Sequence, residues 1–176
     1  MTAQTTLCVL LLAVSPGMGL AQNSPPDAPP ELRPPAETQL VLHASAKGDQ
    51  IYTCKQDAGQ YAWALKAPAA QLFDAQGNDI GHHFGGPTWE LKDGSAVVGK
   101  VAARADSPDK DSVPWLLLTA ADHSGSGLMA GVTHIQRLNT KGGKAPAAGC
   151  DASHAGQETR VAYSADYYFY GTQIEH

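Results

Sequence analysis

The chain has 176 residues, of which 43% are hydrophobic and 16% charged, which suits one ordinary globular domain. Its formal net charge of −5, without clustered Lys and Arg, argues against nucleic-acid binding and leaves no basic stripe for anionic membranes. No stretch is long and apolar enough to span a bilayer as a helix, so no membrane span is expected.

A short apolar run near the N-terminus, residues 7–14, predicts a signal peptide. Small residues follow and end in Gly19-Leu20-Ala21, which fits the small-x-small pattern before a cleavage point. No Lys or Arg precedes the run, so the amino terminus alone supplies positive charge. We expect residues 1–21 to be removed and the mature protein to be secreted or periplasmic, and a buried structural helix is the alternative.

Residues 22–36 are rich in proline and are expected to be a linker. Repeated proline favours extended polyproline conformation and removes backbone donors, which suits a tether or lead-in. A proline ligand for a partner protein is the alternative. The folded domain is expected to occupy residues 37–176 as a single unit.

In the folded part, short apolar segments alternate with turns, which is typical of strands. Expected strands are residues 39–44, 50–55, 61–65, 70–74, 88–91, 95–103, 115–119, 132–138 and 159–170. Asp93-Gly94 is a strong hairpin signal, whereas Lys47-Gly48-Asp49 is interpreted as a turn and residues 67–70 could hold a helical turn. We expect an all-β fold, a single antiparallel sandwich or barrel of about nine to ten strands.

Two cysteines, Cys54 and Cys150, remain after loss of the leader, which carries Cys8. An isolated pair in an oxidising compartment most often forms one disulfide. A reactive thiol pair and a metal site are the alternatives, but neither cysteine belongs to a C-x-x-C or C-x-x-C-H motif. We therefore expect a structural disulfide.

Several side chains are assigned from the alternation of strand residues. Trp63 and Trp115 are expected in the core, whereas Trp89 is the better candidate for a site wall. Arg137 and Asp166 lie on apolar strands, and a buried salt bridge between them is expected because buried charges need partners. In the last strand one face is expected to carry Val161, Tyr163, Ala165, Tyr167 and Phe169, with Tyr168 and Tyr170 opposite.

The most distinctive segment is GHHFGGPTWE, residues 81–90. Glycine permits backbone angles that other residues avoid and proline fixes φ, so the segment predicts a shaped turn that is either a site or only a tight corner. Imidazole and carboxylate are normal metal ligands, but adjacent strand residues point to opposite faces unless the chain bends. The candidate ligand-binding residues are His82, His83, Trp89 and Glu90, and the candidate metal ligands are His82 and His83.

Aromatic-walled hollows with a few polar groups are the usual form of small-molecule sites. The favoured function is therefore an extracytoplasmic small-molecule-binding or envelope-interaction module. The alternative is a small metal-dependent or acid–base enzyme that uses His82, His83 and Glu90. No G-x-S-x-G elbow is present, and neither a catalytic set nor a cofactor can be picked out of the sequence.

The motif order resembles a family of exported bacterial and fungal proteins defined as a domain of unknown function. The residues that carry the resemblance are QIYTC (50–54), APAAQLFD (67–74), GHHFGGPTWE (81–90), DGS (93–95), VPWLLL (113–118), THIQR (133–137), Gly142-Gly143 to Pro146, Gly149-Cys150 and YSADYYF (163–169). The resemblance implies an intact single domain, export and the two-cysteine framework, and it implies no activity. Some fungal relatives carry a malate dehydrogenase label, which this sequence does not support because no G-x-G-x-x-G follows a strand and opens a helix.

Overall fold

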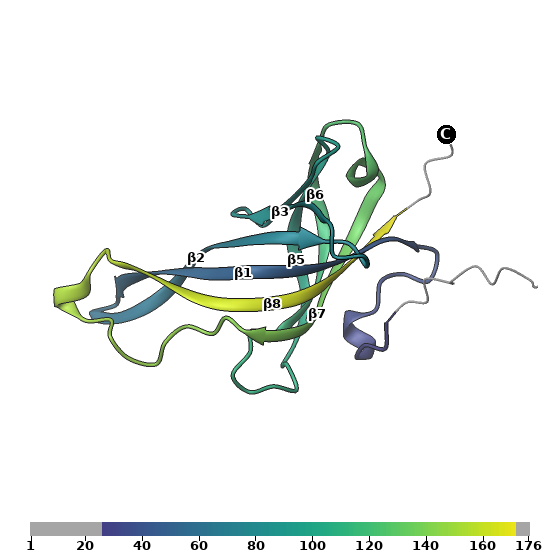
Figure 1. Ribbon diagram of the computed structural model, residues 1–176. Helices are drawn as coiled ribbons and strands as arrows, with labels where there is room; N and C mark the ends of the chain where they lie inside the picture. Colours follow the sequence, from purple (N-terminus) through teal and green to yellow (C-terminus); the bar gives the residue numbers. More distant parts are fainter. Residues whose placement is uncertain (1–25, 172–176) are drawn as a thin grey trace, which may run out of the picture.

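The computed structural model describes residues 26–171, which form a closed antiparallel barrel of eight strands (Figure 1). Each strand pairs with the next along the chain, and β8 closes the ring by pairing with β1. The strands are β1 (Gln39–Asp57), β2 (Gln60–Phe73), β3 (Asp79–Phe84), β4 (Thr88–Leu91), β5 (Ala96–Ala105), β6 (Trp115–Ser124), β7 (Val132–Gly142) and β8 (Glu158–Gly171). The short 3-10 helices of the described part are η1 (Pro30–Leu32), η2 (Leu128–Gly131) and η3 (Ala152–His154).

The predicted all-β fold is confirmed, and it takes the form of a barrel. Among residues 26–171, no helix has the length and apolar character needed to cross a membrane. The predicted leader, residues 1–21, lies outside the described residues.

The nine predicted strands become eight because two predicted pairs are each continuous, whereas β3, whose residues 81–84 were assigned to a shaped turn, was not predicted as a strand. β1 runs through Gly48, which was expected to lie in a turn, and a Cβ at this glycine would meet the Ala69 carbonyl oxygen at 2.1 Å. A glycine inside a strand often marks a close approach of another backbone, and here that backbone is β2. β2 likewise continues through residues 67–70, the predicted helical turn. Two long strands therefore replace four short ones.

β1, β2 and β8 are paired along most of their length, and Figure 1 shows their ribbons reaching well beyond the other strands. The extended parts of β1, β2 and β8 form an arm, and the segment 143–157, which connects β7 to β8, runs along this arm to its tip (Figure 1). The predicted disulfide is confirmed: Cys54 of β1 is bonded to Cys150 of the segment, with a sequence separation of 96. The bond joins the arm to a segment that has little regular structure of its own.

The barrel interior is packed by the inward-facing side chains of the strands. On β8 the predicted alternation is confirmed, because Tyr163, Tyr167 and Phe169 are buried in the main core, whereas Tyr168 packs on the outside. The largest fully buried side chains of this core are Trp89, Tyr167, Phe169, Leu72, Leu118, Met129 and Ile135.

A second, smaller core lies on the outer face of the barrel. Ala28 and Leu32 are buried there against Leu117 of β6 and Leu138 of β7. The Leu32 carbonyl oxygen also accepts a hydrogen bond from Gln136 Nε2 at 2.6 Å. This part of the predicted linker therefore differs from a free tether, because an apolar leucine among its prolines covers an apolar strip of the sheet.

Candidate functional site

A cavity of about 350 Å³ lies inside the barrel. Every one of the eight strands contributes at least one lining residue, which places the cavity in the lumen rather than on one face of the wall. Leu65 of β2 and Val101 of β5 line it while remaining 56% and 44% exposed, so they mark its mouth. The other lining residues are Gln50, Tyr52, Lys66, Ala67, Pro68, His83, Gly86, Pro87, Trp89, Arg104, Val113, Pro114, Leu116, Leu118, Arg137 and Tyr167.

The turn between β3 and β4 forms part of the cavity rim. Gly86 has φ of 116°, a conformation that residues with a side chain rarely adopt, and Pro87 follows it. The hydroxyl of Thr88 donates a hydrogen bond to the Gly85 carbonyl oxygen at 3.1 Å, which holds the turn. The glycine–proline corner therefore has a shaped backbone and borders the lumen.

The barrel wall separates the four predicted site residues into two pairs. His83 and Trp89 are register partners, point inward and are 2% and 1% exposed. His82 and Glu90 are the adjacent register partners and point outward, with 3.8 Å between His82 Nε2 and Glu90 Oε1. The cause is the two-residue alternation of a strand. The structure thus brings together His83 and Trp89 at the lumen, and His82 and Glu90 outside it.

The buried His83 ring is neutral at physiological pH. Burial lowers the pKa of His83 to about 3, the hydrogen bond with Thr88 opposes this shift, and the charge of Arg137 adds to it. His83 Nδ1 lies 2.8 Å from the Thr88 carbonyl oxygen, which can only accept, so Nδ1 carries the hydrogen and Nε2 keeps a lone pair. The ring stacks on Trp89 at 4.4 Å and meets Tyr167 edge-on at 5.1 Å.

Arg137 brings a positive charge to the lumen from β7. Its Nε and Nη2 donate hydrogen bonds to the Pro114 carbonyl oxygen at 3.2 and 2.8 Å. Its charge lowers the pKa of the Tyr167 phenol, although burial has the larger effect and raises that pKa overall. None of the ion pairs within residues 26–171 includes Arg137.

The predicted ion pair between Arg137 and Asp166 is wrong. The two side chains lie on opposite faces of the barrel wall, since Arg137 lines the lumen whereas Asp166 points outward. There Asp166 Oδ1 lies 3.4 Å from His43 Nε2, and Asp166 Oδ2 accepts a hydrogen bond from Asn139 at 2.8 Å.

The lining of the cavity is electropositive. Its charged side chains are Lys66, Arg104 and Arg137, and no carboxylate is among the described lining residues. Lys66 forms an ion pair with Glu158, whereas Arg104 takes part in none within residues 26–171. This excess of positive charge occurs in a chain whose net charge is −5.

Two buried donors beside the cavity lack partners in the described part of the chain. They are Nε1 of Trp89 and Nε2 of Gln50. The Gln50 side chain lies within reach of the Tyr163 phenol and lowers its pKa, although burial has the larger effect and raises that pKa overall. An unsatisfied buried donor costs about 1–3 kcal/mol, so both groups are suited to water or a bound ligand.

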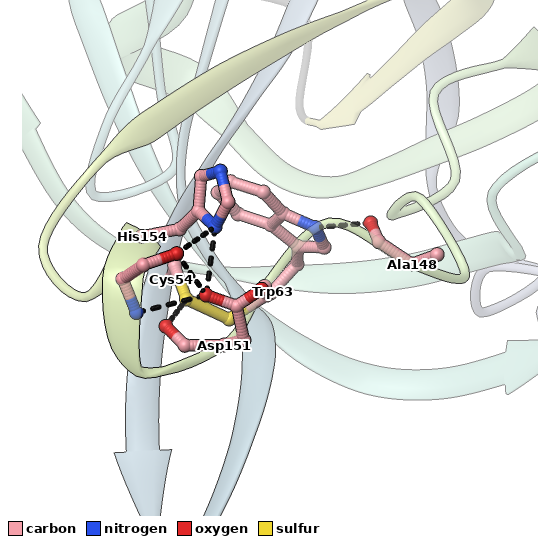
Figure 2. A network of polar contacts seen from close by, with 7 residues as sticks. Cys54, Trp63, Ala148, Asp151 and His154 are labelled. Atoms are coloured by element: carbon pink, nitrogen blue, oxygen red, sulfur yellow. Dashed lines mark hydrogen bonds and ion pairs between the residues drawn. A yellow bond between two sulfur atoms is a disulfide. The ribbon is translucent and has the colours of Figure 1, made fainter.

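A second polar cluster lies beside the disulfide (Figure 2). Asp151 Oδ1 accepts hydrogen bonds from the backbone nitrogen and hydroxyl of Ser153 at 2.8 and 2.6 Å and lies 2.8 Å from His154 Nδ1. The Ser153 and His154 hydrogen bonds lower the pKa of Asp151 to about 2. All three contacts converge on one carboxylate oxygen at the start of η3, so the cluster caps a turn and does not form the serine–histidine–acid order of a hydrolase.

Trp63 helps to hold this same segment, because its Nε1 donates a hydrogen bond to the Ala148 carbonyl oxygen at 2.9 Å (Figure 2). Trp63 and Trp115 are both half-buried, and Trp115 packs against the outer core, so their assignment to the barrel core is wrong. Trp89, predicted to be a site wall, is the tryptophan of the barrel interior and also lines the cavity.

The metal hypothesis depends on where the imidazoles lie. Between residues 26 and 171, no three or more His, Cys, Asp or Glu side chains form a group that could hold a metal ion. The rings of His82 and His83 are on opposite sides of the wall, so they do not share a position for one ion.

Sequence reasoning did not select Arg137 for the site, whereas Tyr167 belongs to the aromatic cluster of the last strand that could line a barrel mouth or a groove. The arginine in an apolar strand was the available signal, and it was assigned to an ion pair instead. Leu65 and Val101 carry no such signal, because their place at the mouth depends on how the barrel closes.

Comparison with known proteins gives one result on the family. A family model described as "Protein of unknown function (DUF3455)" matches residues 34–171. No curated protein and no solved structure matches the chain.

Proposed function

Since the chain belongs to this family, whose function is unknown, we propose from the cavity that the barrel is an exported module that binds a small molecule in its lumen. The observation that carries the proposal is the cavity of about 350 Å³, to which all eight strands contribute. The lumen of an eight-stranded barrel is either filled by side chains or holds one small ligand. A volume of this size with apolar walls and a few polar groups is typical of the second case.

The export part of the proposal is supported by the disulfide between Cys54 and Cys150. Disulfides persist in oxidising compartments and are rare in the cytosol of most organisms. A secreted or periplasmic location agrees with this bond and with the leader predicted for residues 1–21.

The proposed ligand contacts include only two of the four residues predicted from the segment 81–90. His83 and Trp89 keep their role as lining residues, whereas His82 and Glu90 lie on the outer face. An acid–base or metal enzyme built on His82, His83 and Glu90 has less support, because these three side chains do not converge.

The experiment is a thermal-shift screen of the purified protein without its leader, with sugars, apolar metabolites and divalent metals as separate classes. A ligand that binds only the folded state raises the melting temperature. Val101→Trp places a large ring at the cavity mouth, and Leu128→Trp is the matched control, since these two residues are 44% and 41% exposed and Leu128 does not line the cavity.

We expect an organic ligand to stabilise the wild-type protein, the Leu128→Trp variant and a His82→Ala variant, and to lose its effect in Val101→Trp. A stabilisation that survives Val101→Trp, or that disappears in His82→Ala, would place the ligand outside the lumen. An envelope-interaction module is the second candidate, favoured by the exposed apolar side chains of Leu65 and Val101 at the mouth. Co-sedimentation with isolated envelope, without any shift from small molecules, would support it.

A further inference from the structure

The positive charge of Arg137 has no counter-charge within the described residues. The Nε side of its guanidinium is occupied by one carbonyl oxygen, that of Pro114, which accepts from both Nε and Nη2. The Tyr167 phenol lies beside the guanidinium, since Arg137 lowers the pKa of that phenol through its charge and a side-chain hydrogen bond. The outer edge of the guanidinium, formed by Nη1 and Nη2, can bind a carboxylate with two parallel hydrogen bonds. Arg137 is half-buried, and a partly desolvated charge is stabilised by such a partner.

The polar groups around Arg137 favour a ligand that accepts hydrogen bonds. The unpartnered atoms Nε1 of Trp89 and Nε2 of Gln50 are donors, and their residues are 1% and 2% exposed. Burial raises the pKa of the Tyr167 phenol more than the charge of Arg137 lowers it, so its hydroxyl stays protonated and can donate a hydrogen bond. Together with the absence of carboxylates from the described lining, these donors create a pocket for negative charge.

The other end of the cavity is apolar. Leu65 and Val101 mark the mouth, and Leu116 and Leu118 continue the apolar wall inward. Exposed large apolar side chains are ordinary when scattered, but a pair at the mouth of one cavity provides a surface that a bound apolar group would cover. The cavity therefore has hydrogen-bond donors and the Arg137 guanidinium on its inner side, whereas apolar side chains, flanked by the exposed Lys66 and Arg104, line its opening.

We infer that the ligand of the lumen is an amphipathic organic anion, a monocarboxylate whose head binds Arg137 and whose apolar body extends toward Leu65 and Val101. The inference rests on the proposed function and adds the chemical class of the ligand and the residue that selects it. Arg104 at the mouth adds to the attraction for anions, whereas Arg137 supplies the directional contact.

The first test needs only the wild-type protein and three probes with the same ten-carbon chain: decanoate, decanol and decylamine. Isothermal titration calorimetry is expected to show affinities in the order decanoate, decanol, decylamine. A hydrogen-bonded contact between a carboxylate and arginine contributes about 1.5–3 kcal/mol, which corresponds to roughly ten- to a hundredfold in affinity over decanol. Equal affinities of decanoate and decanol, tighter binding of decylamine, or no binding of decanoate would overturn the inference.

The second test removes the head contact. Arg137→Gln is expected to weaken decanoate binding roughly tenfold or more while leaving decanol binding within about twofold. Arg160→Gln is the matched control, because Arg160 pairs with Asp49 outside the cavity, and it is expected to change neither affinity. Unchanged decanoate affinity in folded Arg137→Gln would refute the role of Arg137.

The two proposals fail in different ways. Binding of decanol and decanoate with equal affinity, blocked by Val101→Trp, would refute the anion inference and leave lumen binding in place. If Arg137→Gln does not fold, the order of the three probes on the wild-type protein decides the inference alone.

Discussion

The neutral, buried His83 should make the stability of this protein depend on pH in the weakly acidic range. Burial lowers the pKa of this imidazole from 6.5 to about 3 in the folded state, whereas the unfolded chain keeps the ordinary value. Below pH 6.5 the unfolded state therefore binds a proton that the folded state refuses. The contribution of His83 to stability is fully present above pH 6.5 and is lost as the pH falls toward 3.

The magnitude follows from the same two values. Each pH unit between them corresponds to about 1.4 kcal/mol, so the free energy of unfolding should fall by up to about 5 kcal/mol across the whole interval. Between pH 6.5 and 5.0 the expected loss is about 2 kcal/mol. This narrower window is preferable, because the carboxylates whose pKa values are lowered, such as Asp151, lose their stabilising contribution at more acidic pH.

The assay is urea denaturation of the wild-type protein and of His83→Gln at several pH values from 7.5 to 5.0. Glutamine stays neutral and its amide can still donate to the Thr88 carbonyl oxygen, so the variant should be less stable at pH 7.5 but should lack the acid slope. The His154→Gln variant, which alters an exposed imidazole, should still lose stability as the pH falls from 6.5 to 5.0, as the wild-type protein does. His134 also has a pKa lowered by burial, so the difference between wild type and His83→Gln isolates the effect of His83.

The reasoning is refuted if wild type and His83→Gln lose stability in parallel between pH 6.5 and 5.0. It is also refuted if NMR shows the His83 ring of the folded protein titrating near its ordinary value.

Two further predictions concern the framework. Replacing both Cys54 and Cys150 by alanine should lower the free energy of unfolding by about 4 kcal/mol, since the bond closes a loop with a sequence separation of 96; guanidinium denaturation would measure this, and a loss below about 1 kcal/mol would contradict it. Gly48→Ala should cost about 1–3 kcal/mol or more, because its Cβ would lie 2.1 Å from the Ala69 carbonyl oxygen in β2; an unchanged thermal midpoint would show that the strands separate there without strain.

Several features could be predicted from the sequence because they depend on neighbouring residues or on a small count. The Asp93-Gly94 hairpin was confirmed, and Asp93 holds it by accepting hydrogen bonds from the backbone and hydroxyl of Ser95 at 2.8 and 2.6 Å. The disulfide could be predicted because only two cysteines follow the predicted leader, and the structure confirms it. The inward face of β8 could be predicted because alternation along a strand is a local property, and the buried residues confirm it.

Other features were wrong or incomplete for physical reasons. A glycine such as Gly48 marks either a chain reversal or a close approach of two backbones, and only the second strand shows which. Arg137 and Asp166 were paired because buried charges need partners. The sequence does not show which charges are buried or on which side of the barrel wall each side chain lies. Leu32 was assigned to a tether because its proline-rich surroundings were considered without the apolar strip that it covers.

The all-β class and the disulfide could be read from the residues alone, and opposite orientations of His82 and His83 were expected only if the chain stays extended between them. The closed barrel was needed to show that the chain stays extended through both histidines, that His83 is the one facing the lumen, that Arg137 lines it without an ion pair among residues 26–171, and where the cavity opens. Alternation of side chains is a local property of each strand. Which face of the strand lies inside the barrel is set only when β8 pairs with β1 and the sheet closes.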